Sequence, residues 1–277
     1  MVQHLESVKR HFEKMDARVR IDSWDKSDTR RGRLYDVDVQ GTGRQGQEVF
    51  VLAGPADGPV EFLVLDLDRV DRHLLLMVKQ TLEDGSVEKH RYLCGHDERS
   101  WFAAAVPGNG RGITSILEAK EALKPSAARL AQQRAGVREK DRHRRHNRGY
   151  LRQGEWFFIP ASRLEVDPCL ILHREPLRRG GGKAHVVEHA LRRGGTTVYV
   201  SPQHPQGVSQ TTYERLIKQD PQARGDGWRV MKRNPEVYGQ GRVTHPDHAT
   251  LVLRQWHRIL PNTEDQAPWI HHLTFLD

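Results

Sequence analysis

The chain has 277 residues, enough for one large domain or two of moderate size. It has no run near the roughly 18 to 20 apolar residues that cross a bilayer, and its charged N-terminus lacks the apolar segment of a secretory signal. Its two cysteines exclude a disulfide framework and a four-cysteine zinc site. We therefore expect a cytoplasmic protein with no membrane partner. Lys and Arg number 44 against 36 Asp and Glu, and the formal net charge of +8 favours polyanionic partners wherever this excess is concentrated.

The N-terminal half of the chain predicts a helix followed by a sheet. Apolar residues recur at helical spacing at Leu5, Val8, Phe12, Met15 and Val19. About five strands follow, over "RLYDVDV", "QEVFVLA", "VEFLVLDLD", "HLLLMVKQTL" and "VEKHRYLC", with hairpin signals at "QGTGRQG" and "EDGS". A helix is then expected over "ITSILEAKEALK", ended by Pro125 and with its buried side formed by Ile113, Ile116, Leu117 and Leu123.

The C-terminal half again predicts mostly strands. Apolar residues on both faces of "EWFFIPA" indicate that Trp156, Phe157 and Phe158 lie in a core and do not stack on bases. "PCLILHRE" predicts another strand, and "KAHVVEHALRRGGTTVYVSPQ" a hairpin turning at Gly194-Gly195. A helix over "SQTTYERLIKQDPQ", capped by Ser209 or Thr211, precedes one or two strands over "RVTHPDHATLVLRQWHRIL".

These elements predict an α+β fold with two small mixed or antiparallel sheet lobes and a few flanking helices. The N-terminal lobe would cover 1–123, a helical and arginine-rich connector 124–152, and the C-terminal lobe 153–277. A single domain with a basic excursion is the alternative.

The strongest concentration of charge lies in the connector. Seven cations between Arg138 and Arg152 face only Glu139 and Asp141. Arginine suits bidentate contact with phosphate, so we expect a nucleic-acid-associated protein that holds a phosphate backbone. The principal contacts would be Arg142, Arg144, Arg145 and Arg148, with His143 and His146 as auxiliary donors that gain charge below about pH 6.5.

The same basic segment has two other interpretations. It could be a solvated connector without a ligand, or it could dock on an acidic protein partner in a structural or assembly protein. The sequence does not distinguish DNA from RNA, and it leaves open whether the chain is an enzyme.

A second candidate site lies in "THPDHATLVLRQWHR". His245, Asp247, His248 and His257 offer imidazoles and a carboxylate, which could hold a divalent ion such as zinc, manganese or iron. The chain would then be a metal-dependent hydrolase, a class that includes nucleases. The competing interpretation is that "HPDH" is a polar turn.

Three other groups are weaker candidates. His185, Glu188 and His189 match the H-x-x-E-H pattern of inverted zinc metallopeptidases, but that chemistry needs a helix and the flanking residues predict a strand. Cys94 and His96, with Asp97 or Glu98, could form a thiolate nucleophile, although catalytic groups usually come from distant segments. A last group of carboxylates could hold magnesium in a nuclease, at Asp66, Asp68 and Asp71.

Overall fold

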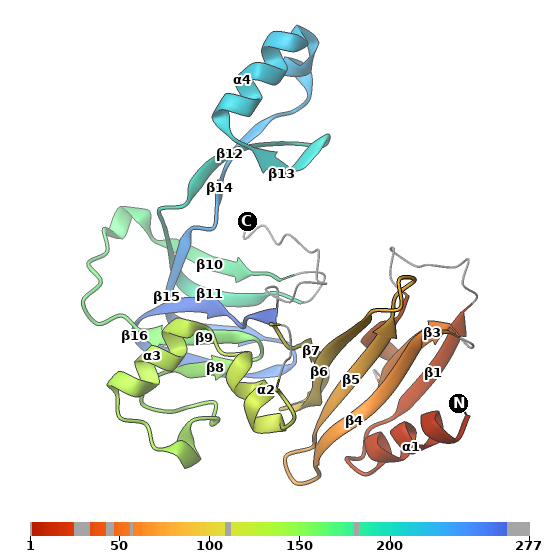
Figure 1. Ribbon diagram of the computed structural model, residues 1–277. Coiled ribbons are helices and arrows are strands. Elements are labelled where there is room, and N and C mark those ends of the chain that lie inside the picture. The colour runs from red at the N-terminus through yellow and green to blue at the C-terminus, as the bar shows by residue number, and fades with distance from the viewer. Residues whose placement is uncertain are drawn as a thin grey trace. The chain divides into compact units, whose positions relative to one another are not determined.

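The computed structural model describes residues 2–24, 34–42, 47–55, 58–108, 112–179 and 183–264 (Figure 1). Half of the chain is strand and a fifth is helix, in four sheets and, among the described residues, four α-helices. The predicted α+β class is therefore wrong, and the fold is dominated by sheets. The helices have only 7 to 12 residues each, so they cover patches of sheet without forming a layer.

The chain divides into two compact units. Among the described residues, the first unit comprises 2–126 with its gaps, 138–144 and 262–264, and the second comprises 127–137 and 145–261. The basic segment is shared between them, because Arg138–Arg144 belongs to the first unit and Arg145 begins the second unit's part.

The described part of the first unit contains two α-helices and two sheets. Helix α1 (Val2–Glu13) buries Val8 and Phe12, which confirms the predicted amphipathic helix, but it ends before the buried Met15. The first sheet has the order β1-β3-β2, from β1 (Val19–Trp24), β3 (Gln47–Pro55) and β2 (Asp36–Thr42). The second has the order β4-β5-β6-β7, from β4 (Val60–Asp68), β5 (His73–Thr81), β6 (Val87–Asp97) and β7 (Ser100–Ala105).

Helix α2 (Ile116–Ala122) begins at a capping box between Ser115 and Glu118. It ends before Pro125, as predicted, and Ile116 is buried. The prediction for Leu117 is wrong, since that side chain is 60% exposed: the buried face passes through Ile116 and Ala119.

A six-stranded antiparallel sheet forms the body of the second unit. Its order is β10-β11-β15-β16-β9-β8, built from β10 (Leu172–Leu177), β11 (His185–Arg193), β15 (Glu236–His245), β16 (His248–Pro261), β9 (Trp156–Pro160) and β8 (Leu151–Gln153). Helix α3 (Ser126–Arg134) and the 3₁₀ turn η3 (Pro168–Leu170) are not part of this sheet, and the 3₁₀ turn η2 (Glu139–Asp141) belongs to the first unit. Trp156 and Phe158 are buried in its core, which confirms that these rings pack inside.

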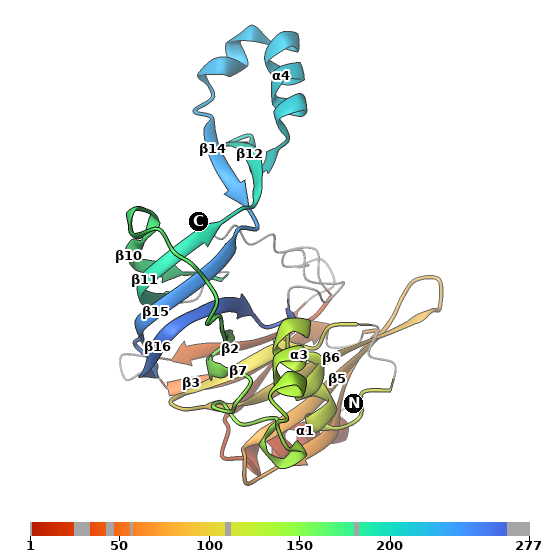
Figure 2. The same ribbon diagram turned by 90° about the vertical axis from the view of Figure 1, so that its left-hand side faces the viewer.

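The predicted hairpin at Gly194-Gly195 is wrong. Strand β12 (Thr196–Ser201) pairs with β13 (His204–Val208) and β14 (Arg229–Arg233), and not with β11. Both glycines have positive φ, 70° and 87°, and they direct the chain into a separate three-stranded sheet. This sheet, with α4 (Gln210–Gln219) and the 3₁₀ turn η4 (Pro221–Gly225), forms an arm over residues 196–233 that extends from the six-stranded sheet (Figure 2).

The strand pairing of the six-stranded sheet is irregular. Register shifts interrupt its pairing between Val187 and His189 and between Gly239 and Gly241. The Gln153 amide donates to the carbonyl oxygen of Ala249 at 2.6 Å, so the β8–β9 turn lies against the start of β16. Within the described part of the chain, no helix combines the length and the apolar character of a membrane span.

Candidate metal centre

Three histidines lie side by side at one end of the six-stranded sheet. His185 begins β11, His245 ends β15 and His248 begins β16, and these strands are neighbours. The β11–β15 register reaches Val186 opposite Thr244, and His245 is paired with His248 across a two-residue turn. Side chains level with one another in an antiparallel sheet project from the same face, so the three rings gather.

The rings are close enough to share one ion. The centroid of the His245 ring lies 4.1 Å from that of His185 and 4.7 Å from that of His248. One nitrogen of each ring lies within 4.8 Å of one nitrogen of each other ring. An ion at about 2.0 to 2.1 Å from each nitrogen requires the half-buried rings of His245 and His248 to turn slightly inward.

His185 is the unusual member of the group. Its side chain is only 1% exposed, and neither ring nitrogen has a hydrogen-bond partner among the described residues. Trp156 Nε1 and Gln153 Oε1, from the β8–β9 hairpin, are also buried without a partner in that part of the chain. Each such atom costs about 1 to 3 kcal/mol unless something binds it. These orphaned atoms fit a site that takes a ligand.

Two of the three histidines, His185 and His245, favour their neutral form. Burial lowers the pKa of His185 to about 3, helped by His245 and His248 and opposed by Asp247. Burial also lowers the pKa of His245. A neutral imidazole has the free lone pair that a metal ion requires.

Gly154 leaves space beside the rings. It occupies the β8–β9 turn with φ +55°, and a Cβ built there would lie 2.9 Å from His248 Nε2 and 3.3 Å from His185 Nε2. Both Nε2 atoms therefore border a spot that only the absence of a side chain keeps open.

Residues of the β15–β16 turn and Lys183 hold the His245 ring in place. The backbone N–H of Asp247 donates to His245 Nδ1 at 3.1 Å, and the carbonyl oxygen of Lys183 accepts from the same ring. The Asp247 carboxylate forms an ion pair with Lys183 at 2.8 Å. An ion bound by His245 would replace one of the two ring contacts.

The structure brings together only part of the predicted ligand set. His245 and His248 belong to the group, whereas Asp247 faces Lys183. His257 lies nine residues along β16 from His248, and its Nδ1 contacts the carbonyl oxygen of Gln255 at 2.7 Å. The third histidine is His185, from the H-x-x-E-H match. The rest of that motif points elsewhere, since Glu188 accepts from the backbone N–H of Arg242.

The predicted nucleic-acid contacts differ in exposure. In the first unit Arg142 and Arg144 are exposed, and Arg144 forms an ion pair with Asp141 at 3.2 Å. Burial is the main cause that lowers the pKa of His143 to about 4, and the nearby positive charge of Lys124 is the second. The expectation that His143 gains charge just below pH 6.5 is therefore wrong. In the second unit the remaining predicted contacts are half-buried or exposed, at Arg145, His146 and Arg148.

The other catalytic candidates have structural roles. Cys94 is fully buried and burial raises the pKa of its thiol, so no thiolate is available. Asp66 accepts from the backbone N–H of Ile116 at 2.8 Å, and Asp68 from that of Asp71 at 2.9 Å.

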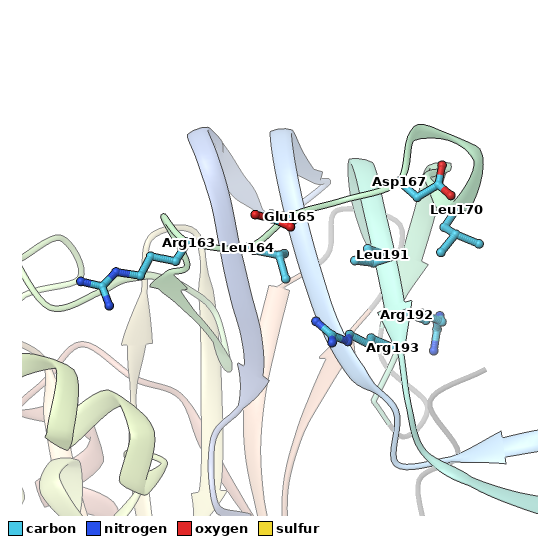
Figure 3. Close-up of a pocket in the computed structure, with 8 residues that line it drawn as sticks. All are labelled: Arg163, Leu164, Glu165, Asp167, Leu170, Leu191, Arg192 and Arg193. Carbon is cyan, nitrogen blue, oxygen red and sulfur yellow. The ribbon is translucent and has the colours of Figure 1, made fainter.

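A shallow hollow of about 430 Å³ lies on the second unit (Figure 3). Its lining contains three arginines together with the carboxylates of Glu165 and Asp167. One of these arginines, Arg192, forms an ion pair with Glu175 at 2.8 Å. Figure 3 shows Arg163 extending away from the rest of the lining. These mixed charges indicate no particular ligand.

No protein-family model, curated protein or solved structure matches this chain.

Proposed function

We propose that the protein is a metal-dependent hydrolase, whose second unit binds a divalent transition-metal ion through His185, His245 and His248. The observation that carries this proposal is the buried His185 ring, whose two nitrogens lack partners among the described residues while two further histidine rings stack beside it. Three imidazoles suit zinc best, with other first-row ions as competitors.

The ligand number favours a catalytic role. Three protein ligands leave one position of a tetrahedral ion open to water, and bound zinc lowers the pKa of such a water to about 7. The chain's part is to hold the imidazoles at one end of the sheet, with His185 fixed by burial and His245 by its turn. The Lys183–Asp247 ion pair lies next to this turn and supplies charged groups beside the centre.

A competition titration tests the proposal. Protein stripped with a chelator and dialysed should bind one zinc ion per chain against a chromophoric chelator, and should then acquire hydrolytic activity on an activated ester or phosphodiester. Failure to bind zinc would refute the metal site. Tight binding without any hydrolysis would leave a metal-binding protein and refute the hydrolase.

Gly154→Ala should weaken zinc binding at least tenfold while every ligand remains. The new methyl group would lie 2.9 Å from His248 Nε2, in the space where the ion must be held. The matched control is Gly136→Ala in the same unit, with φ +58° and no atom within 4 Å of the added Cβ. Both variants carry the same backbone strain of about 1 to 2 kcal/mol. An equal loss of affinity in both would show that strain, and not obstruction of the site, is responsible.

A second candidate function is binding of a nucleic-acid phosphate backbone by the basic segment. We propose it because Arg138, Arg142 and Arg144 are all exposed on one short stretch of the first unit. Arginine forks match phosphate oxygens, and such contacts need no base recognition.

Changing Arg138, Arg142 and Arg144 together to Ala should weaken binding of DNA or RNA oligonucleotides and flatten the log-log salt slope by about 2 to 3. The measurement is fluorescence anisotropy between about 50 and 300 mM salt. The control removes the same charge from exposed residues of the arm, by Arg215, Lys218 and Arg224 to Ala. If both triple variants lose affinity equally, net charge is responsible and the basic segment is no specific site.

A further inference from the structure

We infer that His173 and His189 form a second, surface site for a divalent transition metal, separate from the three-histidine centre. The two residues are directly paired between β10 and β11. Their Nδ1 atoms lie 3.2 Å apart, and the rings are nearly perpendicular, at 83°, with centroids 5.1 Å apart.

This separation matches the span between two ligands of one ion. Two imidazole nitrogens bound to one ion at about 2.0 to 2.1 Å lie about 3.3 Å apart in a tetrahedral shell and about 2.9 Å apart at neighbouring corners of the square-planar shell that Cu²⁺ prefers, and the observed 3.2 Å falls between these values. In the metal-free pair one Nδ1 donates its proton to the other, because two neutral nitrogens at this distance share one hydrogen bond. An ion that binds both nitrogens replaces this proton and releases it to solvent.

The strands set this geometry. In β10 the residue after His173, Arg174, has φ 55°, and the β10–β11 register passes over it. In β11 the register with β15 shifts between Val187 and His189. Irregularities of this kind redirect side chains, and here they accompany a histidine pair whose rings contact each other on the surface.

The pair offers a weaker and more accessible site than the three-histidine centre. Both side chains are accessible to solvent, with His189 37% exposed. Glu188 approaches only the far nitrogen of His189, at 3.7 Å from Nε2, and its other oxygen accepts from the Arg242 backbone. The ion would thus have two protein ligands, with water completing its shell. Among first-row divalent ions such a nitrogen pair favours copper and then nickel.

The test is made with Cu²⁺ in a background of His185→Ala, His245→Ala and His248→Ala, which removes all three ligands of the three-histidine centre. Electron paramagnetic resonance of this protein should show one Cu²⁺ per chain with two coordinated nitrogens. Adding His189→Ala, or separately His173→Ala, should remove one nitrogen from the spectrum and weaken binding at least tenfold. Adding His146→Ala, which changes another exposed histidine of the same unit, should leave both unchanged.

An unchanged spectrum and affinity in the His173 and His189 variants would overturn the inference. The outcome does not depend on the three-histidine centre, because all comparisons are made without it. Should the native protein fail to bind zinc, the metal proposal above falls while this one is still decided by the copper spectra.

Discussion

Replacing His185 by Ala should lower the zinc affinity of the protein at least 100-fold. The same change should abolish the stabilisation of the folded protein against unfolding by zinc. His185 is the buried ligand, so its loss removes the one ring that the fold fixes and leaves two half-buried histidines on a turn. At a free zinc concentration 100 times the dissociation constant, the native protein should gain about 2.7 kcal/mol in its free energy of unfolding. Competition titration and thermal unfolding with and without zinc measure the two effects.

His257→Gln is the control for this prediction. His257 is buried in the same sheet and was a predicted ligand, but the structure places it outside the three-histidine group. Its variant should keep the affinity for zinc whatever it does to stability. The proposed centre would be contradicted if His257→Gln lost zinc and His185→Ala retained it.

The second large effect is loss of stability in acid. Burial keeps His185 neutral in the folded protein with a pKa of about 3, against about 6.5 in the unfolded chain. Below pH 6.5 the His185 side chain therefore binds a proton in the unfolded chain but not in the folded protein. The contribution of this residue is fully present above pH 6.5 and is lost as the pH falls towards 3. A shift of this size corresponds to a few kcal/mol at most, on the order of 1.4 per pKa unit.

Hydrogen exchange of the β11 and β15 amides, in metal-free protein between about pH 7 and 4, can isolate this contribution after correction for intrinsic exchange rates. His185→Gln should show a flatter dependence on pH than the native protein. The four other histidines with lowered pKa values, His90, His143, His245 and His257, remain in both proteins, so the difference between the two curves arises from the change at residue 185. Parallel curves would show that His185 is not held neutral by burial.

The sequence predicts local elements better than their partners. The apolar spacing of Val8 and Phe12 is enough to place a helix, and the aromatic residues of "EWFFIPA" are enough to place a buried strand. The pairing of β12 is not predictable in this way, because Gly194-Gly195 is as typical of a tight hairpin as of the junction seen here. The pairing is decided by contacts distant in sequence, such as the close approach of Gly195 to the carbonyl oxygen of Arg233, 38 residues further along the chain, which would lie 2.9 Å from a Cβ at residue 195.

The same limit applies to the candidate centre. His245 and His248 can be grouped from sequence, since a two-residue turn must bring its flanking residues together. His185 joins them only through the β11–β15 register, which no local pattern encodes. His257 is close in sequence, yet nine residues of extended strand at about 3.3 Å each carry it far from His248.

The arm has a consequence for how this protein can change in length. The chain leaves the six-stranded sheet at Arg193 and re-enters it at Glu236, and these two residues are paired with each other. All residues between them therefore form an insertion at a single rung, that is, at one residue pair, of the β11–β15 pairing. Segments can be gained, shortened or exchanged at this rung without shifting any other pair of the sheet, at the cost of closing a loop alone. The rung lies at the opposite end of β11 from His185, so such variation would leave the histidine end of the sheet in place.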